Sequence, residues 1–273
     1  GYTMVYGIAK MLNFAHGDVI MIGSYVVYFA FGASGLNPVL SIVLSMIVCT
    51  ILGVVIERLA YRPLREAPSL AVLITAIGVS YLLQQVAQLS WSSNPKSFTS
   101  VVSGMKPVSL FGGQLTISAE TIVTIVACVV IMVVLMWFVN YTPAGHAMLA
   151  VSEDRGAAQL MGVNVNGTIS LTFAIGSALA AIAGALLCSS YPTLQPTTGA
   201  MPGIKAFVAA VFGGIGSIPG AVIGAFIIGI CESFIKANEN IAVFSNAFTF
   251  ALLIIILLCK PNGLFGEKLT EKV

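Results

Sequence analysis

The sequence predicts an all-α protein, a polytopic transmembrane helical bundle forming a single domain over residues 1–273. Two of its helices are expected to be broken or re-entrant, and one short polar helix is expected on the cytoplasmic side. Of the residues, 58% are hydrophobic and only 8% are charged, against roughly a quarter charged in soluble domains. Apolar runs close to the about 20 residues that cross the hydrocarbon core recur along the chain. Helices are favoured because they satisfy their own backbone groups in lipid.

The charged residues and the cysteines bear on which partners and metals to expect. The charged residues lie in loops and not on one basic face, so the net charge of +2 neither indicates nor excludes nucleic acid. We expect contact with membrane lipid and none with nucleic acid. All five cysteines lie in apolar runs without metal-ligand spacing, so we interpret them as small buried hydrophobic residues and expect no metal.

The chain opens on an apolar run that ends in the polar cluster NFAHGD, residues 13–18. The run has no basic leader, and we expect that a preceding part of the first helix lies before Gly1. The apolar run after the cluster is short for a full span, which indicates a broken or re-entrant helix. Such a break must face protein or a water-filled path. Asn13 and His16 either line a translocation path or cap the two helix ends, and the pattern fits both.

A dense basic loop, residues 57–66, follows the next long run and places that end of the bundle in the cytoplasm by the positive-inside rule. We expect the opposite charges of Glu57 and Arg58 to lie at the lipid headgroups. In the following run, residues 70–91, the amides of Gln84 and Gln88 lie one turn apart on one helix face. They either hydrogen-bond to other helices or line a polar path.

Residues 92–118 are rich in Ser, Gly and Pro and are expected to form an extracytoplasmic loop. Within the loop, residues 108–117 alternate loosely around a Gly-Gly pair, which predicts a small β-hairpin. An external partner can contact this loop, although a passive connection fits the pattern equally well.

The polar segment that the chain is organised around is residues 153–162, EDRGAAQLMG, within a predicted helix at 152–163. Ser152 is expected to cap the first turn, with Glu153 and Asp154 at the positive end of the helix dipole. Gly162 is expected to end the helix. A small apolar face would dock on a protein outside the bilayer. The candidate docking residues are Glu153, Asp154, Arg155, Ala158, Leu160, Met161 and Gly162.

A second interruption lies in residues 201–225, where glycines and Pro219 split an apolar run. The preceding run, 169–187, carries many small residues and therefore belongs inside the bundle. Paired interruptions in two halves are typical of transporters built from structural repeats. Lys205 is expected to snorkel outward or to meet an external partner. The candidate path residues are Asn13, His16, Gln84, Gln88, Gly214 and Gly216.

The sequence lacks a phosphate-binding G-x-x-x-x-G-K-[ST] loop and any clustered nucleophile, base or metal ligand, so we predict no catalytic residue and no cofactor. Acids within the apolar runs are nearly missing, whereas ion-coupled carriers usually need an ionisable relay. Energy for transport must then come from a partner. The alternative is a self-sufficient carrier or channel in which Asn13, His16 and Asp18 act as coupling or gating residues.

Three stretches carry a family resemblance: residues 1–25, residues 152–187 and the run GIKAFVAAVFGGIGSIPGAVIGA at 203–225. They resemble the first permease subunit of branched-chain amino acid ABC importers, within the ribose and branched-chain type of permease. The resemblance implies a multi-pass protein of the bacterial inner membrane. It also implies three kinds of partner: a second homologous permease, two cytoplasmic ATPase subunits and an extracytoplasmic substrate-binding protein.

By the same resemblance, residues 153–162 match the coupling helix that sits in a groove of the ATPase, and transport proceeds by alternating access. Relatives that carry urea, amides or other amino acids share much of the pattern, so the substrate stays open. The sequence departs from the family at His146, Leu149 and Gly167, where basic or polar residues are expected. Arg155 is therefore the only full positive charge of the expected docking region.

Overall fold

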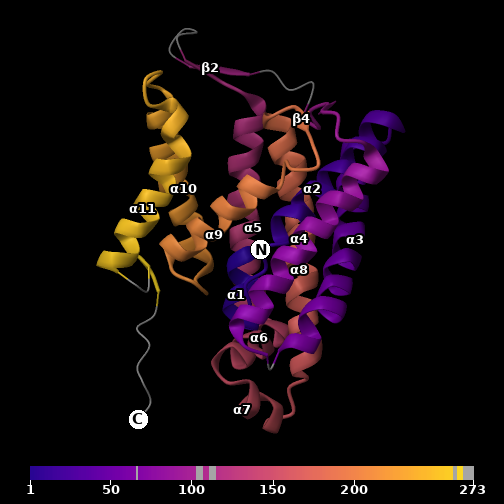
Figure 1. Ribbon diagram of the computed structural model, residues 1–273, viewed down its shortest axis with the longest axis vertical. Coiled ribbons are helices and arrows are strands. Elements are labelled where there is room, and N and C mark those ends of the chain that lie inside the picture. Colours follow the sequence, from indigo (N-terminus) through magenta and orange to yellow (C-terminus); the bar gives the residue numbers. More distant parts are fainter. Residues whose placement is uncertain (66, 103–106, 111–114, 261–262, 267–273) are drawn as a thin grey trace.

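The computed structural model describes residues 1–273 except 66, 103–106, 111–114, 261–262 and 267–273. The described chain is a bundle of helices with two small pairs of strands (Figure 1). The helices are α1 (Tyr2–Ala9), α2 (His16–Val27), α3 (Pro38–Ile56), α4 (Ser69–Trp91), α5 (Ala119–Tyr141), α6 (Pro143–Glu153), α7 (Arg155–Leu160), α8 (Val165–Ser190), α9 (Ala200–Gly213), α10 (Ile218–Lys236) and α11 (Ser245–Cys259). The π-helical turns η1 (Tyr28–Ala33) and η2 (Glu57–Tyr61) extend α2 and α3, and η3 (Arg62–Leu64) and η5 (Ala242–Phe244) are short 3₁₀ turns.

Within the described residues, six helical segments are long and apolar enough to cross a membrane. They are 38–64, 69–91, 119–141, 165–190, 218–236 and 242–259. The predicted all-α polytopic bundle is confirmed. Below, the end of the bundle that carries α6 and α7 is called the α7 end, and the opposite end is called the β2 end (Figure 1).

Helix starts follow the expected cap chemistry. The side chains of Asn37, Ser118, Thr142, Asn164 and Ser217 each accept a hydrogen bond from a backbone N–H in the first turn of the helix that follows. Pro occupies the first turn in three of these helices, α3, α6 and α10, where its missing N–H costs nothing. The polar residues between apolar runs therefore fix where these five helices begin.

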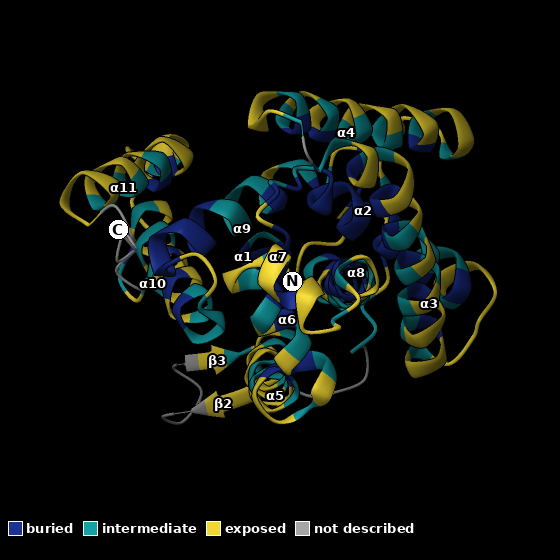
Figure 2. Ribbon diagram, turned by 90° about the horizontal axis from the view of Figure 1, so that it is seen from below, coloured by how far each residue is buried: buried dark blue, intermediate teal, exposed yellow. Residues whose placement is uncertain are grey.

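The core lies on α1, α2, α8 and α9, whose ribbons are mostly buried or half-buried, while α4, α5 and α11 present exposed faces at the periphery (Figure 2). Small residues allow close packing at the centre. A Cβ added to Gly23 of α2 would lie 2.8 Å from the Cα of Ala181, and one added to Gly53 of α3 would lie 2.0 Å from the Ser177 Oγ. The prediction that residues 169–187 belong in the interior is confirmed, because α8 supplies both partners.

Exposed apolar side chains on the outer helices fit lipid contact. Among the cysteines, Cys49 and Cys188 are buried as predicted. Cys128 and Cys259 are exposed on α5 and α11, so the prediction was wrong for these two. In lipid an exposed thiol behaves as a small apolar group, and the apolar run gives no sign of which face it occupies.

The strands lie at the β2 end. β2 (Val108–Leu110) pairs antiparallel with β3 (Leu115–Ile117), which confirms two strands in the predicted hairpin, and the turn between them lies outside the described residues. β1 (Lys96–Ser97) pairs antiparallel with β4 (Thr193–Leu194). The second pair joins the loop after α4 to the segment between α8 and α9, a link that the sequence pattern did not predict.

Both predicted interruptions are present, and the chain reverses direction at each. At the first, α1 begins beside the ring of His16 and ends at Ala9, whose carbonyl accepts a hydrogen bond from Arg155 at the α7 end. Residues 10–15 then return to His16 at the start of α2.

At the second interruption, α9 and α10 pack as an antiparallel hairpin around residues 214–217. Gly213 lies against Gly220, Gly224 lies against Ala209, and farther along Lys205 pairs with Glu232. The interruption is therefore a turn, and Pro219 lies in the first turn of α10. Lys205, expected to snorkel outward or to meet an external partner, pairs within this chain with Glu232 of α10, with its Nζ 2.6 Å from the Glu232 Oε1.

Candidate functional site

The segment 153–162 lies at the α7 end and is less regular than predicted. Glu153 is the last residue of α6, Asp154 is extended, and α7 spans only Arg155–Leu160. A continuous helix over 152–163 was therefore wrong. The cause is Asp154, whose side chain stops one helix and starts the next.

Asp154 and not Ser152 caps the first turn of α7. The Asp154 Oδ1 accepts hydrogen bonds from the backbone N–H of Gly156 at 2.8 Å and of Ala157 at 3.0 Å. The hydroxyl of Ser152 donates to the Leu149 carbonyl within α6, at 2.7 Å. The predicted end of the segment is confirmed, because Gly162 has a φ of +85°, the left-handed conformation that glycine adopts readily.

The apolar residues of segment 153–162 divide between two sides. Ala158 is buried in the main core. Leu160 and Met161 are 90% and 84% exposed, values that are unusual for large apolar side chains away from the apolar faces of the spans. α7 therefore packs on the bundle through Ala158, and Leu160 and the following Met161 are exposed on the outside.

Arg155 is directed inward, toward the bundle. Its Nη2 donates to the carbonyl oxygen of Ala9, the last residue of α1. Partial burial lowers the pKa of Arg155, and the neighbouring charge of Arg65 adds to this effect. The expectation that Arg155 supplies the positive charge of an outward docking face does not match this arrangement.

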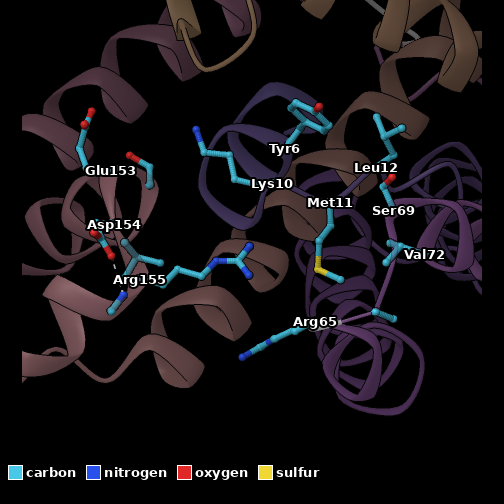
Figure 3. A pocket seen from close by; sticks show the side chains of 14 residues that line it. Tyr6, Lys10, Met11, Leu12, Arg65, Ser69, Val72, Glu153, Asp154 and Arg155 are labelled. Carbon is cyan, nitrogen blue, oxygen red and sulfur yellow. Dashed lines mark hydrogen bonds between the residues drawn. The ribbon is translucent and has the colours of Figure 1, made fainter. Parts of the chain in front are cut away.

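A cavity of about 550 Å³ separates segment 153–162 from the first chain reversal. Lys10, Arg65 and Arg155 reach into it from three different segments (Figure 3). Glu153 and Asp154 line the side formed by the segment itself. Three cations from separate elements therefore surround one space at the α7 end.

The basic loop, residues 57–66, holds a buried carboxylate that sequence reasoning misplaced. Glu57 is fully buried and accepts hydrogen bonds from Arg65 and from the Ser170 hydroxyl, the latter at 2.6 Å. Arg65 also donates to Asn166 in the first turn of α8. Glu57 does not lie with Arg58 at the lipid headgroups, because the π-helical turn η2 directs it toward α8 and Arg65.

Of the candidate path residues, His16 and Gly216 contact α1, whereas Asn13 bonds to Tyr61 and Gln84 bonds to Asp18 of α2. Asn13 is buried, and its Oδ1 accepts a hydrogen bond from the Tyr61 hydroxyl at 3.0 Å. His16 is buried, and its ring meets the Tyr2 ring edge-on with centroids 5.8 Å apart. The Gln84 Nε2 donates to the Asp18 Oδ1 at 2.9 Å, two residues from His16.

The glycines of the second reversal complete this group. Gly216 lies against α1, since a Cβ on Gly7 would be 2.9 Å from the Gly216 Cα. Gly214 and Gly216 have φ values of +105° and +93°, which L residues rarely adopt. Gln88 is half-buried one turn beyond Gln84 and extends the same face of α4. Among the described residues, no group of three or more His, Cys, Asp or Glu side chains is placed to hold a metal ion.

The comparisons with known proteins agree with this architecture. The family model described as "Branched-chain amino acid transport system / permease component" matches residues 1–257. The chain belongs to this permease family. It is 42% identical over 285 residues to the high-affinity branched-chain amino acid transport system permease protein BraD of Pseudomonas aeruginosa, covering all of this chain and 92% of that protein.

Two further relatives extend the comparison. The permease is 41% identical over 284 residues to the permease protein LivH of Escherichia coli, covering all of this chain and 91% of that protein. It is 30% identical over 286 residues to a probable branched-chain amino acid transport permease of Methanocaldococcus jannaschii, covering 97% of this chain and 86% of that protein. No solved structure matches the chain.

Proposed function

We propose that this permease is the membrane subunit of an ATP-driven importer of branched-chain amino acids in the bacterial inner membrane. Relatives of 41% and 42% identity over the whole chain carry that substrate class in their names. Family membership favours a subunit of an assembly over a self-sufficient carrier. The observation that carries the coupling role is the exposed pair Leu160 and Met161 on α7, at 90% and 84%.

Charge sets the orientation. Lys10, Arg58, Arg62, Arg65 and Arg155 all belong to segments at the α7 end. By the positive-inside rule this end faces the cytoplasm. The loop 92–118 and both strand pairs then face the outside, where a substrate-binding protein delivers its ligand.

Segment 153–162 is suited to dock on an ATPase subunit. The Asp154 cap and Gly162 fix its two ends, and Ala158 anchors it on the bundle. The outward pair Leu160 and Met161 then fills an apolar groove on the partner, as helix-in-groove contacts do. Movement of the ATPases on binding ATP is passed to the bundle through this contact.

The two chain reversals mark the translocation path. The first reversal extends from His16 to the charged α7 end, and we place the second within the bilayer, where irregular backbone is tolerated next to protein or water. Asn13 and His16 lie at the first reversal, and Gly214 and Gly216 belong to the second. Gln84 and Gln88 lie on α4, where Gln84 bonds to Asp18 in the first turn of α2. The buried residues among these candidates are already paired or packed, so they shape the path without forming a tight substrate site. Weak contact suits an importer whose binding protein supplies the selectivity.

The full assembly in this proposal has a second homologous permease, two ATPase subunits and one external binding protein. A reconstitution of that assembly tests the proposal through Leu160→Asp. A charge at the groove contact should abolish coupled uptake while leaving the permease inserted and stable, because Leu160 touches little of its own chain. Leu160→Met is the matched control and should keep uptake near wild type.

Uptake of labelled leucine and ATP hydrolysis are measured on the same vesicles. Unchanged uptake by Leu160→Asp would contradict the coupling role. Co-purification of the permease alone, without ATPase subunits, would contradict the subunit assignment.

A further inference from the structure

We infer that Arg155 is the positioning residue that joins segment 153–162 to α1, so that movement of the segment displaces the first chain reversal. This inference rests on the proposed function. It concerns a side chain that sequence reasoning assigned to the ATPase surface and that the fold directs inward. The link is the hydrogen bond from the Arg155 Nη2 to the Ala9 carbonyl.

The Ala9 carbonyl oxygen is a favourable acceptor for a cationic donor. Ala9 is the last residue of α1, and its carbonyl belongs to the end of the helix that carries the negative part of the dipole. Lys10 follows with a φ of +51°, so the helix ends there and its last carbonyls are free to accept from outside. A hydrogen bond from a charged guanidinium is about twice as strong as a neutral one.

From Ala9 the connection continues along α1 to both reversals. Residues 2–9 form one continuous helix, so a displacement at its end is carried along its hydrogen-bonded backbone. Its first residues lie beside His16, and Gly7 lies against Gly216. Displacement of the Ala9 carbonyl should therefore move α1 against the start of α2 and the turn between α9 and α10.

The neighbouring contacts supply a fixed frame for this movement. Arg65 binds both Glu57 at the end of α3 and Asn166 at the start of α8. Glu57 is fully buried and also bonded to Ser170, so α3 and α8 are locked together next to segment 153–162. The segment is thus held to the frame where α8 begins and to α1 through Arg155.

The cavity gives the movement room. It lies between residues 10–12, the basic loop and residues 151–156, which are the parts that would move relative to one another. A close-packed boundary would resist displacement of α1, whereas an open space of about 550 Å³ accommodates it.

The test compares Arg155→Gln, Arg155→Lys and the matched control Arg62→Gln in the reconstituted complex. Arg62 is an exposed cation of the basic loop at the same end. We expect Arg155→Gln to lower the amount of leucine transported per ATP hydrolysed by about tenfold. That factor corresponds to the free energy of one charge-assisted hydrogen bond. Arg155→Lys keeps a charged donor on a long side chain, which the shorter neutral glutamine does not supply, and should recover most of this ratio. Arg62→Gln should leave it unchanged.

A second readout separates coupling from simple stability. Amide hydrogen exchange of residues 2–15 is measured with and without ATP and vanadate. The nucleotide-dependent difference should be present in Arg62→Gln and Arg155→Lys and lost in Arg155→Gln. Persistence of this difference in Arg155→Gln, or an equal fall of uptake and hydrolysis, would overturn the inference. Failure of the proposed function gives a different result, since Leu160→Asp would then retain uptake even with Arg155 intact.

Discussion

Gly199, the residue before α9, lies against Gly17 in the first turn of α2 with no room for a side chain. A Cβ added to Gly199 would lie 1.8 Å from the Gly17 carbonyl oxygen and 2.6 Å from its carbonyl carbon. Both atoms belong to the backbone of a buried helix, so neither can turn aside. Gly199→Ala should therefore force α9 away from α2 and weaken the junction between the two reversals.

The size of the effect follows from the contact. An ordinary carbon–oxygen approach is about 3.3 Å, so the two backbones must separate by about 1.5 Å. Overpacking of this kind costs about 1–3 kcal/mol. For a chain of this size, that cost should lower the melting temperature by about 2–12 °C.

The assay is thermal unfolding of the purified permease in detergent, with leucine uptake measured in parallel. Gly78→Ala is the matched control, because Gly78 lies inside α4 with no heavy atom within 4 Å of an added Cβ. There the substitution should stabilise the helix by up to about 1 kcal/mol. Equal melting temperatures for the two variants would refute the packing argument.

Three further substitutions test other contacts. Glu57→Ala removes the buried partner of Arg65 and should destabilise the permease by about 3–5 kcal/mol, measured by chemical unfolding; a loss below about 1 kcal/mol would contradict a buried pair. Asp154→Ala removes the α7 cap and should cost about 1 kcal/mol, seen as faster amide exchange at residues 155–160, while Ser152→Ala leaves exchange there unchanged. Tyr61→Phe leaves the Asn13 amide oxygen unpaired and should cost about 1–3 kcal/mol in thermal unfolding, whereas exposed Tyr141→Phe should cost nothing measurable.

The apolar runs predict most of the helices of the fold. The long apolar runs and the interruption at NFAHGD are local signals, and the structure keeps them. The prediction failed where a distant partner decides the outcome. Glu57 was paired with Arg58 because they are adjacent, but the fold brings Arg65 and Ser170 to it, and Arg65 also bonds to Asn166.

The errors in segment 153–162 have a similar cause. Ser152 and Asp154 both have side chains that cap helices, and the sequence alone does not decide between them. α6 decides, because it begins at Pro143 and continues through Ser152, which leaves Asp154 as the first free cap. The inward direction of Arg155 depends on where α1 ends, more than a hundred residues earlier in the chain.

The small sheet formed by β1 and β4 has a mechanical consequence for the β2 end. Its backbone hydrogen bonds attach Lys96 and Ser97 to Leu194 and Thr193, only a few residues before Gly199. A displacement of residues 96–97 is therefore transmitted through the paired strands to residues 193–194, close to the junction of α9 with α2. In the orientation proposed above, a binding protein that contacts residues 96–97 would act on the α9–α2 junction from one end of the bundle, while α1 contacts α9 from the other side.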